Sequence, residues 1–479
     1  MAETIYDVAI IGSGPAGYTA AIRAGQYGLK VALIEKDDKL GGTCLHVGCI
    51  PTKALLFSAE IYDELKQHGA ELGIENVDKA SINWKAVQDR KNKIVTKHAK
   101  GLEFLMKKNK VTTIEGYGRL TGAAKNGIHE VEVYVSGGGG AGGESSILKA
   151  KNVIVATGSE ARMLPNMEPD TKILTNIEIL SLNAIPKSLI VIGSGAVGSE
   201  FASIYRSFNA EVTIIEMLDR LVPVEDADVS KELLRQFKKR GIDCRVSTKV
   251  DKIERTKDGV KVTFTGSDGK QETKEAEKCL IAIGRAPRTD NIGLEKVGIK
   301  VERGFVTPDD KMMTNVPGIL AIGDIVAGMP QLAHAGSMEG LIAVAHIAGK
   351  ASGRIKKSLI PGCTYTEPEI GSVGMTEAQA KEKGLNIKVG KFPFVGNSKA
   401  TIVGNHDGFV KVVADAKYGE ILGVHIIGPK ATELIAEAVT AMQLEGTIDD
   451  LMFTVHAHPT LYEAMLDGFS SVYGLQINV

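Results

Sequence analysis

Two stretches of the chain, residues 8–36 and 189–217, share one order of apolar, glycine-rich and polar positions. Each begins with a short β-branched apolar run, passes through a glycine turn into small and apolar residues at helical spacing, and ends with a second apolar run. Short β-branched runs are typical of parallel strands buried on both faces. The repeat therefore predicts two strand–helix–strand units within an α/β fold.

The glycine turns of the two stretches match in spacing. Their glycines are Gly12, Gly14 and Gly17 in the first and Gly193, Gly195 and Gly198 in the second. Glycines at this spacing allow a tight turn, a close approach of the backbone to phosphate, and close packing of the following helix. The N-terminus of that helix offers unpaired amides to an anion. The repeated turn therefore predicts two dinucleotide-binding sites.

An acidic residue ends each unit at the same distance from its first glycine. Glu35 follows Gly12 by 23 positions (35 − 12), and Glu216 follows Gly193 by the same number (216 − 193). A carboxylate at this place accepts hydrogen bonds from a ribose diol. Because it also repels a 2′-phosphate, we predict that the second site prefers NAD to NADP.

A pair of cysteines, Cys44 and Cys49, follows the first unit and opens a helical pattern. Residues five apart on an ideal helix have Cα atoms about 8 to 9 Å apart, whereas a disulfide needs about 4.4 to 6.8 Å. Gly48 and Pro51 permit the distortion that a disulfide would require. Lys53, four residues after Cys49, places a cation on the same helical face. We interpret the pair as a redox centre.

Two other readings of this segment stay open, namely a structural disulfide and a metal site that adds His46 to the cysteines. A fourth metal ligand is not evident, and we predict no metal. The remaining cysteines (Cys244, Cys279 and Cys363) lie far apart and lack any motif.

Composition narrows the class of protein. Of the 479 residues, 43% are hydrophobic and 24% are charged, as in globular proteins of about three domains. Lys and Arg number 57 against 58 Asp and Glu, which gives no overall attraction to nucleic acid or to an anionic membrane. A secretory signal and an uninterrupted apolar run of about 20 residues are both missing from the sequence. We therefore expect a cytoplasmic protein.

The lysine-rich stretch 85–110 is predicted to be an amphipathic helix with a solvated basic face. The residues assigned to its buried face are Ile94, Leu102 and Leu105, and those placed outside it are Lys91, Lys93, Lys97 and Lys100.

Near the C-terminus, His458, Pro459 and Glu463 form an acid–base pattern. Proline suits the first position of a helix, which would place Glu463 about one turn into it. A carboxylate on one imidazole nitrogen orients the other nitrogen as a base. From the residues alone, the favoured interpretation is that His456 or His458 caps a helix or packs in the core.

Together these motifs resemble the pyridine nucleotide-disulfide oxidoreductase family over nearly the whole chain, and most of all its members that oxidise dihydrolipoamide. The resemblance extends to the ATG sequence at 156–158, to 314–324 and to 331–340. It implies FAD at the first glycine turn, NAD at the second, Asp324 on the ribityl chain of FAD, and 331–340 beneath the flavin ring. The further positions that it implies for cofactor binding are Gly42, Thr43, Lys53, Gly118, Thr157, Gly158, Glu200, Val250, Gly284, Gln331, Leu332, Ala333 and His334.

The resemblance also implies catalytic roles. Cys49 would face the flavin and Cys44 would exchange with substrate. His458 with Glu463 would serve the cysteines of the other subunit of a homodimer, and Lys53 would pair with Glu200. Within the family motif, His46 stands where asparagine is usual and Thr52 where serine is usual.

The implied architecture has two Rossmann-like domains and a C-terminal α+β interface domain. Its expected ranges are 1–158 (FAD), 159–287 (NAD), 288–355 (central, returning to the FAD domain) and 356–479 (interface). A glycine-rich run, 137–143, is expected to be a surface hairpin loop.

The expected partner is a lipoyl-bearing acyltransferase or H-protein of a multienzyme complex. Glutathione-type and mercuric reductases, and a flavoprotein with mainly an assembly role, remain alternatives.

Overall fold

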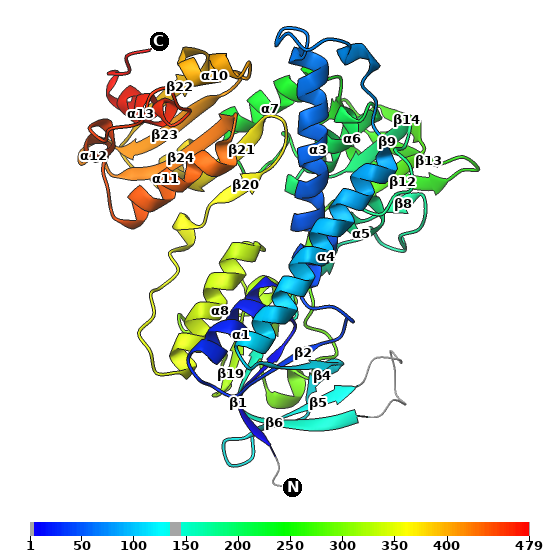
Figure 1. Ribbon diagram of the computed structural model, residues 1–479, viewed down its shortest axis with the longest axis vertical. Coiled ribbons are helices and arrows are strands. Elements are labelled where there is room, and N and C mark those ends of the chain that lie inside the picture. The colour runs from blue at the N-terminus through cyan, green and yellow to red at the C-terminus, as the bar shows by residue number, and fades with distance from the viewer. Residues whose placement is uncertain (1–3, 135–144, 479) are drawn as a thin grey trace. The chain divides into compact units, whose positions relative to one another are not determined.

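The computed structural model describes residues 4–134 and 145–478 (Figure 1). The glycine-rich run 137–143 lies outside the described residues. The chain divides into two compact units: Met1–Pro51, Arg90–Ala161 and Arg285–Ile355 form the first, and Thr52–Asp89, Arg162–Gly284 and Lys356–Val479 the second. The finer division into four domains stays a prediction.

The first unit is built on a seven-stranded sheet of order β3-β2-β1-β6-β5-β4, with β19 also paired to β6. Neighbours among β1, β2, β3, β6 and β19 run parallel, whereas β4 and β5 are antiparallel additions. The strands are β1 (Ile5–Ile11), β2 (Val31–Glu35), β3 (Thr112–Glu115), β4 (Tyr117–Leu120), β5 (His129–Tyr134), β6 (Ser145–Val155) and β19 (Ile319–Ala321).

Strand β1 shows how this sheet separates two cores. Val8 and Ile10 pack into one cluster, which includes residues of α1 (Pro15–Gln26), α8 (Ala333–Ile347) and α4 (Trp84–Lys108). Ala9 and Ile11 pack into a second cluster with β5 and the segment 292–299. This alternation is the period of two that a strand buried on both faces requires.

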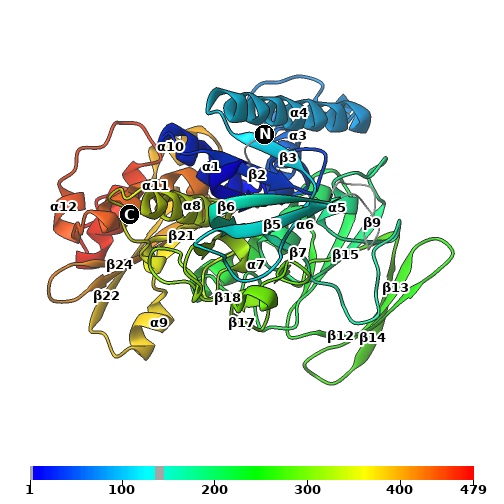
Figure 2. The same ribbon diagram turned by 90° about the horizontal axis from the view of Figure 1, so that it is seen from below.

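Helices α1 and α8 lie side by side in the first unit (Figures 1 and 2). Their backbones approach so closely that a Cβ on Gly340 would lie 2.7 Å from the carbonyl oxygen of Ala16. Small residues at this contact therefore bring the middle of α8 against the start of α1, just after the first glycine turn.

The second unit contains a five-stranded parallel sheet of order β11-β10-β9-β15-β8. Its strands are β8 (Ile173–Leu174), β9 (Ser188–Ile192), β10 (Glu211–Ile215), β11 (Asp243–Arg245) and β15 (Lys278–Ile281), with helices α6 (Ala196–Ser207) and α7 (Ala227–Lys239). A three-stranded antiparallel sheet, β12 (Lys249–Arg255), β13 (Val260–Thr265) and β14 (Gln271–Ala276), accompanies it. Both predicted strand–helix–strand units are confirmed, as β1–α1–β2 and β9–α6–β10.

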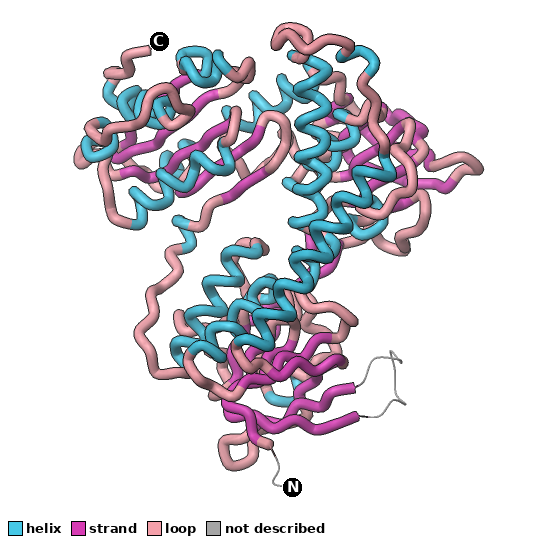
Figure 3. Tube along the Cα trace, viewed as in Figure 1, coloured by secondary structure: helices cyan, strands magenta, loops and turns pink. Residues whose placement is uncertain are grey.

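The C-terminal part of the second unit is an antiparallel sheet of order β20-β21-β24-β23-β22, with helices packed against it (Figure 3). Its strands are β20 (Gly362–Thr364), β21 (Glu369–Gly374), β22 (Ile387–Pro393), β23 (Phe409–Asp415) and β24 (Ile421–Gly428), and its main helices are α11 (Ala431–Gln443) and α13 (Glu463–Ser470). The α/β fold with a C-terminal α+β part is thereby confirmed.

The remaining elements are short, apart from α3 (Cys49–His68). They are α2 (Gly42–Val47), α5 (Asn176–Ile179), α9 (Glu377–Glu382), α10 (Ser398–Ile402), α12 (Ile448–Met452), β7 (Ser159–Ala161), β16 (Arg285–Pro287), β17 (Val301–Glu302) and β18 (Phe305–Val306).

Two local predictions were wrong. Helix α13 begins at Glu463 and not at Pro459, because Glu463 Oε2 accepts a hydrogen bond from the Thr460 backbone N–H at 2.9 Å and holds the preceding residues in a turn. On α4, Lys91 is 5% exposed and belongs to the buried face, whereas Leu105 is 37% exposed.

Among the described residues, one helical segment, Gly42–His68, is long and apolar enough to be a candidate membrane span by length and composition alone. One such segment is weak evidence, since the core helix of a soluble protein passes the same test. It is also interrupted, because α2 ends before Gly48 and Lys53 lies within it.

Candidate active site

The two glycine turns have the same geometry. A Cβ on Gly12 would lie 2.3 Å from a backbone carbonyl oxygen, and a Cβ on Gly17 would lie 1.9 Å from another. The corresponding distances at Gly193 and Gly198 are 2.5 Å and 2.0 Å. Real Cβ atoms do not approach so closely, so these four positions require glycine for the packing of turn, strand and helix.

The middle glycine of each turn has a different environment. A Cβ on Gly14 or on Gly195 would meet no protein atom within 4 Å. Each of these residues is the N-cap of its helix, α1 or α6, and makes no side-chain cap hydrogen bond. A side chain at either position would therefore enter open space beside the N-terminus of the helix, which fits the pyrophosphate of a dinucleotide.

Each acidic residue is fixed by the serine of its own glycine turn. Glu35 Oε2 accepts hydrogen bonds from the backbone N–H and the hydroxyl of Ser13 at 2.8 and 2.6 Å. Glu216 Oε2 accepts the same pair from Ser194, both at 2.8 Å. The turn thus orients the carboxylate that is predicted to bind ribose.

The segment that carries the cysteines is attached directly to the first glycine turn. The backbone N–H of Gly41 donates to the carbonyl oxygen of Ser13 at 3.1 Å and to its hydroxyl at 3.0 Å. A Cβ on Gly42, the first residue of α2, would lie 2.8 Å from Gly14 Cα. Helix α2 therefore starts in van der Waals contact with the first glycine turn.

The predicted distortion between the cysteines is confirmed. Helix α2 ends at Val47, Gly48 adopts φ −144° and ψ −114°, and α3 begins at Cys49. Cys44 and Cys49 are both half-buried and lie on opposite sides of this break. The helical spacing that would separate them is thus interrupted where a disulfide requires it.

The other three cysteines are unsuited to thiolate chemistry. Burial raises the pKa of Cys244 and of Cys279 to about 12, and that of Cys363 to about 11. Their thiols stay protonated at neutral pH, and the thiolate is the reactive form of cysteine. These three thiols are therefore poor candidates for redox chemistry, and the role of Cys44 and Cys49 as the redox pair stays a prediction.

The side chain of His46, the unusual residue between the cysteines, is hydrogen-bonded to a backbone carbonyl group. Its Nε2 lies 2.8 Å from the carbonyl oxygen of Leu40, a distance at which it donates a hydrogen bond. Among the described residues no group of three or more His, Cys, Asp or Glu side chains is placed to hold a metal ion.

Lys53 and Glu200 form the ion pair that the resemblance implies. Lys53 Nζ lies 2.8 and 2.7 Å from the two carboxylate oxygens of Glu200. The side chain of Glu200 is 5% exposed, and its Oε1 also accepts a hydrogen bond from the backbone N–H of Tyr365 at 3.0 Å.

The C-terminal histidines have distinct environments. His458 Nδ1 lies 2.9 Å from Glu463 Oε1, and the His458 side chain is 70% exposed. His456 is 7% exposed, and its Nε2 lies 2.6 Å from Glu437. Although burial opposes the shift, hydrogen bonds from the Thr460 N–H and from His458 lower the pKa of Glu463. His458 therefore combines an ionised partner with an open face, and His456 is engaged internally.

Asp324 lies in a single helical turn, Gly323–Ile325, that follows β19. The hydroxyl of Ser159 donates a hydrogen bond to its Oδ2, and Arg285 Nε lies 2.6 Å from the same hydroxyl and 3.9 Å from Asp324. Gln331 Nε2 donates to the carbonyl oxygen of Asp324 at 3.2 Å. The aspartate is thus held in place by three side chains.

Comparison with known proteins decides the family. Residues 6–340 match the pyridine nucleotide-disulphide oxidoreductase family, and residues 360–467 match its dimerisation domain. The chain belongs to the pyridine nucleotide-disulphide oxidoreductase family. It is therefore a flavoprotein disulfide oxidoreductase whose cofactors are FAD and NAD, and it forms a homodimer.

Individual relatives cover almost the whole chain. The dihydrolipoyl dehydrogenase of Bacillus subtilis (strain 168) is 45% identical over 465 residues, which cover 96% of this chain and 97% of that protein. The leghemoglobin reductase of Glycine max is 40% identical and covers 98% of this chain and 87% of its own length. The crystal structure of LpdA from Mycobacterium tuberculosis superposes with a TM-score of 0.88 at 30% identity, over 97% of this chain and 99% of that one.

Several positions expected to contact FAD lie in this oxidoreductase's first unit. Gly118 packs on the sheet, where a Cβ would lie 3.2 Å from the side chains of Ile11 and Ile34. Thr157 donates to the carbonyl oxygen of Arg288 at 2.5 Å. The others are Thr43 within α2, Gly158 with φ +71°, Leu332 at the N-cap of α8, and Ala333 and His334 in its first turn.

Two further positions expected to bind a cofactor lie in the second unit. Val250 is in β12, and Gly284, with φ +115°, follows β15.

Sequence reasoning missed three residues of the Asp324 region, namely Ser159, Arg285 and Glu339. Glu339 is 1% exposed, and its Oε2 accepts a hydrogen bond from the backbone N–H of Gly323 at 2.5 Å. Burial, together with the charge of Asp324, raises the pKa of Glu339 to about 7. Glu339 lies inside the recognised segment 331–340, but only the fold brings it to Gly323.

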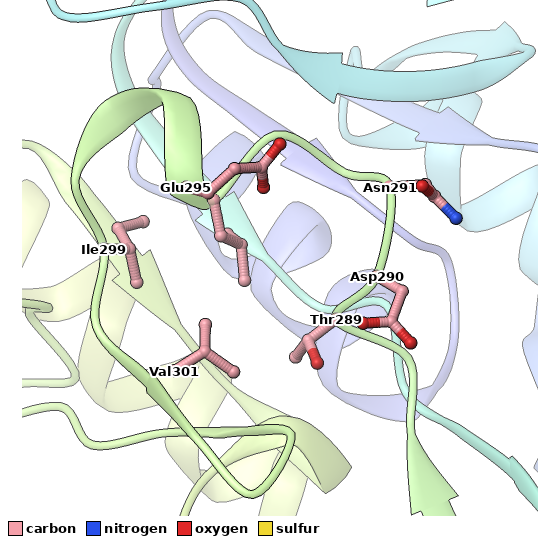
Figure 4. A pocket seen from close by; sticks show the side chains of 7 residues that line it. Thr289, Asp290, Asn291, Glu295, Ile299 and Val301 are labelled. Atoms are coloured by element: carbon pink, nitrogen blue, oxygen red, sulfur yellow. The ribbon is translucent and has the colours of Figure 1, made fainter.

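A pocket of about 580 Å³ lies elsewhere in the first unit, lined by residues of the segment 289–301. Figure 4 shows Ile299 and Val301 across from Thr289 and Asp290. It contains none of the predicted site residues, and its charged groups, Asp290 and Glu295, are both acidic, which does not suit a dinucleotide.

The second glycine turn yields a matched pair of variants. Gly198→Ala forces a backbone shift that costs about 1–3 kcal/mol through overpacking, so it should lower the thermal unfolding midpoint by about 1–3 °C. Gly195→Ala adds a methyl group that meets no protein atom, so it should leave the midpoint unchanged. Because the methyl group enters the space predicted for the pyrophosphate, it should raise the KM for NAD. Equal midpoints, or an unchanged KM in Gly195→Ala, would contradict this division of roles.

The raised pKa of Glu339 predicts that the stability of the protein depends on pH. Its folded pKa is about 7 and its ordinary value is 4.5, so its contribution to stability is complete below about pH 4.5 and is lost as pH rises through 7. The loss amounts to about 3 kcal/mol. Glu339→Gln keeps a hydrogen-bond acceptor for Gly323 without titrating. The thermal unfolding midpoint of this variant should therefore rise relative to that of the wild type between pH 5 and pH 8. A difference between the two midpoints that does not change with pH would refute the raised pKa of Glu339.

Proposed function

We propose that the chain oxidises protein-bound dihydrolipoamide to lipoamide and transfers the electrons through a Cys44–Cys49 disulfide and FAD to NAD⁺. The observation that carries this proposal is the contact between the cysteine-bearing helix α2 and the first glycine turn, where Gly42 abuts Gly14. This contact supports a position for the thiols of Cys44 and Cys49 next to the dinucleotide bound at the first glycine turn. The full-length similarity to proteins named dihydrolipoyl dehydrogenase supports the choice of substrate.

Cys44 is the sulfur that exchanges with substrate in this proposal. A substrate thiolate attacks Cys44 Sγ, a mixed disulfide forms, and Cys49 leaves as a thiolate. The second substrate thiol then displaces Cys44, so lipoamide is released and the protein retains two reduced sulfurs. FAD, when bound, supplies the two-electron carrier between sulfur and nicotinamide. Cys49 and Lys53, one helical turn apart on α3, are the groups assigned to the flavin side.

His458 acts as the base that removes the substrate proton. Glu463 is bound to its Nδ1, which leaves Nε2 to accept a proton and stabilises the imidazolium that results. The 70% exposure of His458 supports a role toward another molecule. We assign it to the cysteine pair of the second subunit, because residues 360–467 form the dimerisation domain.

The nicotinamide cofactor at the second turn is proposed to be bound as NAD through Glu216. Arg220, which could favour a 2′-phosphate, pairs with Asp219 at 3.0 Å. Glu35 is assigned to the ribose of FAD, and Asp324 to its ribityl chain.

The physiological partner is proposed to be a lipoyl-bearing acyltransferase or H-protein, within a cytoplasmic multienzyme complex. The four domains proposed are 1–158, 159–287, 288–355 and 356–479.

Replacing Cys44 with serine tests the proposal. Cys44→Ser should lower NAD-linked oxidation of dihydrolipoamide by about 1,000-fold or more, because no disulfide can form, while FAD remains bound. The matched control is Cys244→Ser, which alters a buried thiol of raised pKa and should keep full turnover. Wild-type rates with dihydrolipoamide, glutathione disulfide and mercuric ion identify the substrate class. Substantial turnover in Cys44→Ser would refute the relay.

A further inference from the structure

The ammonium group of Lys53 lies among groups from three separate segments. Lys53 itself is in α3, and Glu200, which binds Nζ through both carboxylate oxygens, is in α6. Tyr365 follows β20, and the centre of its ring lies 4.5 Å from Lys53 Nζ. That distance is within the range of a cation–π interaction.

Tyr365 contacts both members of the ion pair. Its ring faces the ammonium of Lys53, and its backbone N–H donates to Glu200 Oε1 at 3.0 Å. The carboxylate of Glu200 offsets most of the field of the Lys53 ammonium at nearby groups. The net field that Lys53 exerts on a neighbour therefore depends on the positions of both the ammonium and the carboxylate. A residue that binds the cation and its counterion together fixes both positions.

The phenol of Tyr365 stays neutral under physiological conditions. Burial, reinforced by the neighbouring Cys363 and the carboxylates of Glu200, Glu369 and Glu433, raises its pKa to about 12. The hydroxyl group therefore supplies no charge to the pair. What the side chain provides to Lys53 is the face of its ring, which phenylalanine also provides.

We propose that Tyr365 is a positioning residue that holds Lys53 and Glu200 through its ring face and backbone, and so tunes how strongly Lys53 stabilises the Cys49 thiolate. This inference rests on the proposed function, in which Cys49 carries the thiolate on the flavin side. Lys53 follows Cys49 by four residues on the same helix, so the orientation of its side chain along α3 decides the strength of the effect.

Three variants of the holoenzyme separate the ring from other effects. Tyr365→Phe keeps the ring face, whereas Tyr365→Leu and Tyr365→Met remove it with different shapes. All three retain the backbone N–H that binds Glu200. FAD content and the thermal unfolding midpoint establish which variants are folded, and either Leu or Met suffices for the test.

The readout is the long-wavelength absorbance of the thiolate–flavin pair, recorded anaerobically against pH after reduction by two electrons. We expect Tyr365→Phe to match the wild type. In Tyr365→Leu or Tyr365→Met, the pH at which half of the band is present should rise by about 0.5–1 unit, a three- to tenfold weaker stabilisation of the thiolate. A merely structural role would not move this midpoint.

Two results would overturn the inference: an unchanged midpoint in the folded Leu or Met variant, or a shift in the Phe variant as large as that in the Leu variant. A wild-type protein that binds FAD but shows no such band would instead overturn the proposed function, and the inference with it.

Discussion

The rest of the site depends on one constraint, the packing and hydrogen bonding of the cysteine-bearing segment against the first glycine turn. Gly42 touches Gly14, Gly41 donates to Ser13, and Ser13 donates in turn to Glu35. One set of short contacts thus links the predicted phosphate site, the predicted ribose site and the helix that bears Cys44. Any Cβ at position 42 would push these parts away from one another, so the glycines here serve packing as well as conformation.

Features encoded by nearby residues could be predicted from the sequence. The two strand–helix–strand units follow from the spacing of Gly12 and Glu35, and the break at Gly48 follows from a glycine between two cysteines. The contacts that only folding creates could not be predicted. Ser159 reaches the Asp324 turn from a distant segment and Glu339 from within α8, and no local pattern connects either to it.

The two C-terminal histidines also show that contacts created by folding could not be predicted from the sequence. Spacing alone could not separate His456 from His458, because the two lie only two positions apart and the partner of His456, Glu437, is 19 residues away in the sequence. The fold pairs His456 with Glu437 in the interior and leaves His458 exposed. The buried charge of Lys411 in the second unit is likewise paired internally, with Asp226, Asp228 and Glu377. His458 also has a partner, Glu463, but its side chain remains exposed, which suits the proposed role toward the other subunit.

The most direct test of a sulfur-to-flavin relay is an anaerobic titration of the purified protein with NADH. The account predicts a yellow protein that develops a long-wavelength band after about one equivalent of this two-electron donor, while most of its flavin stays oxidised. A colourless protein, or a flavin that bleaches in proportion to NADH without such a band, would contradict the relay.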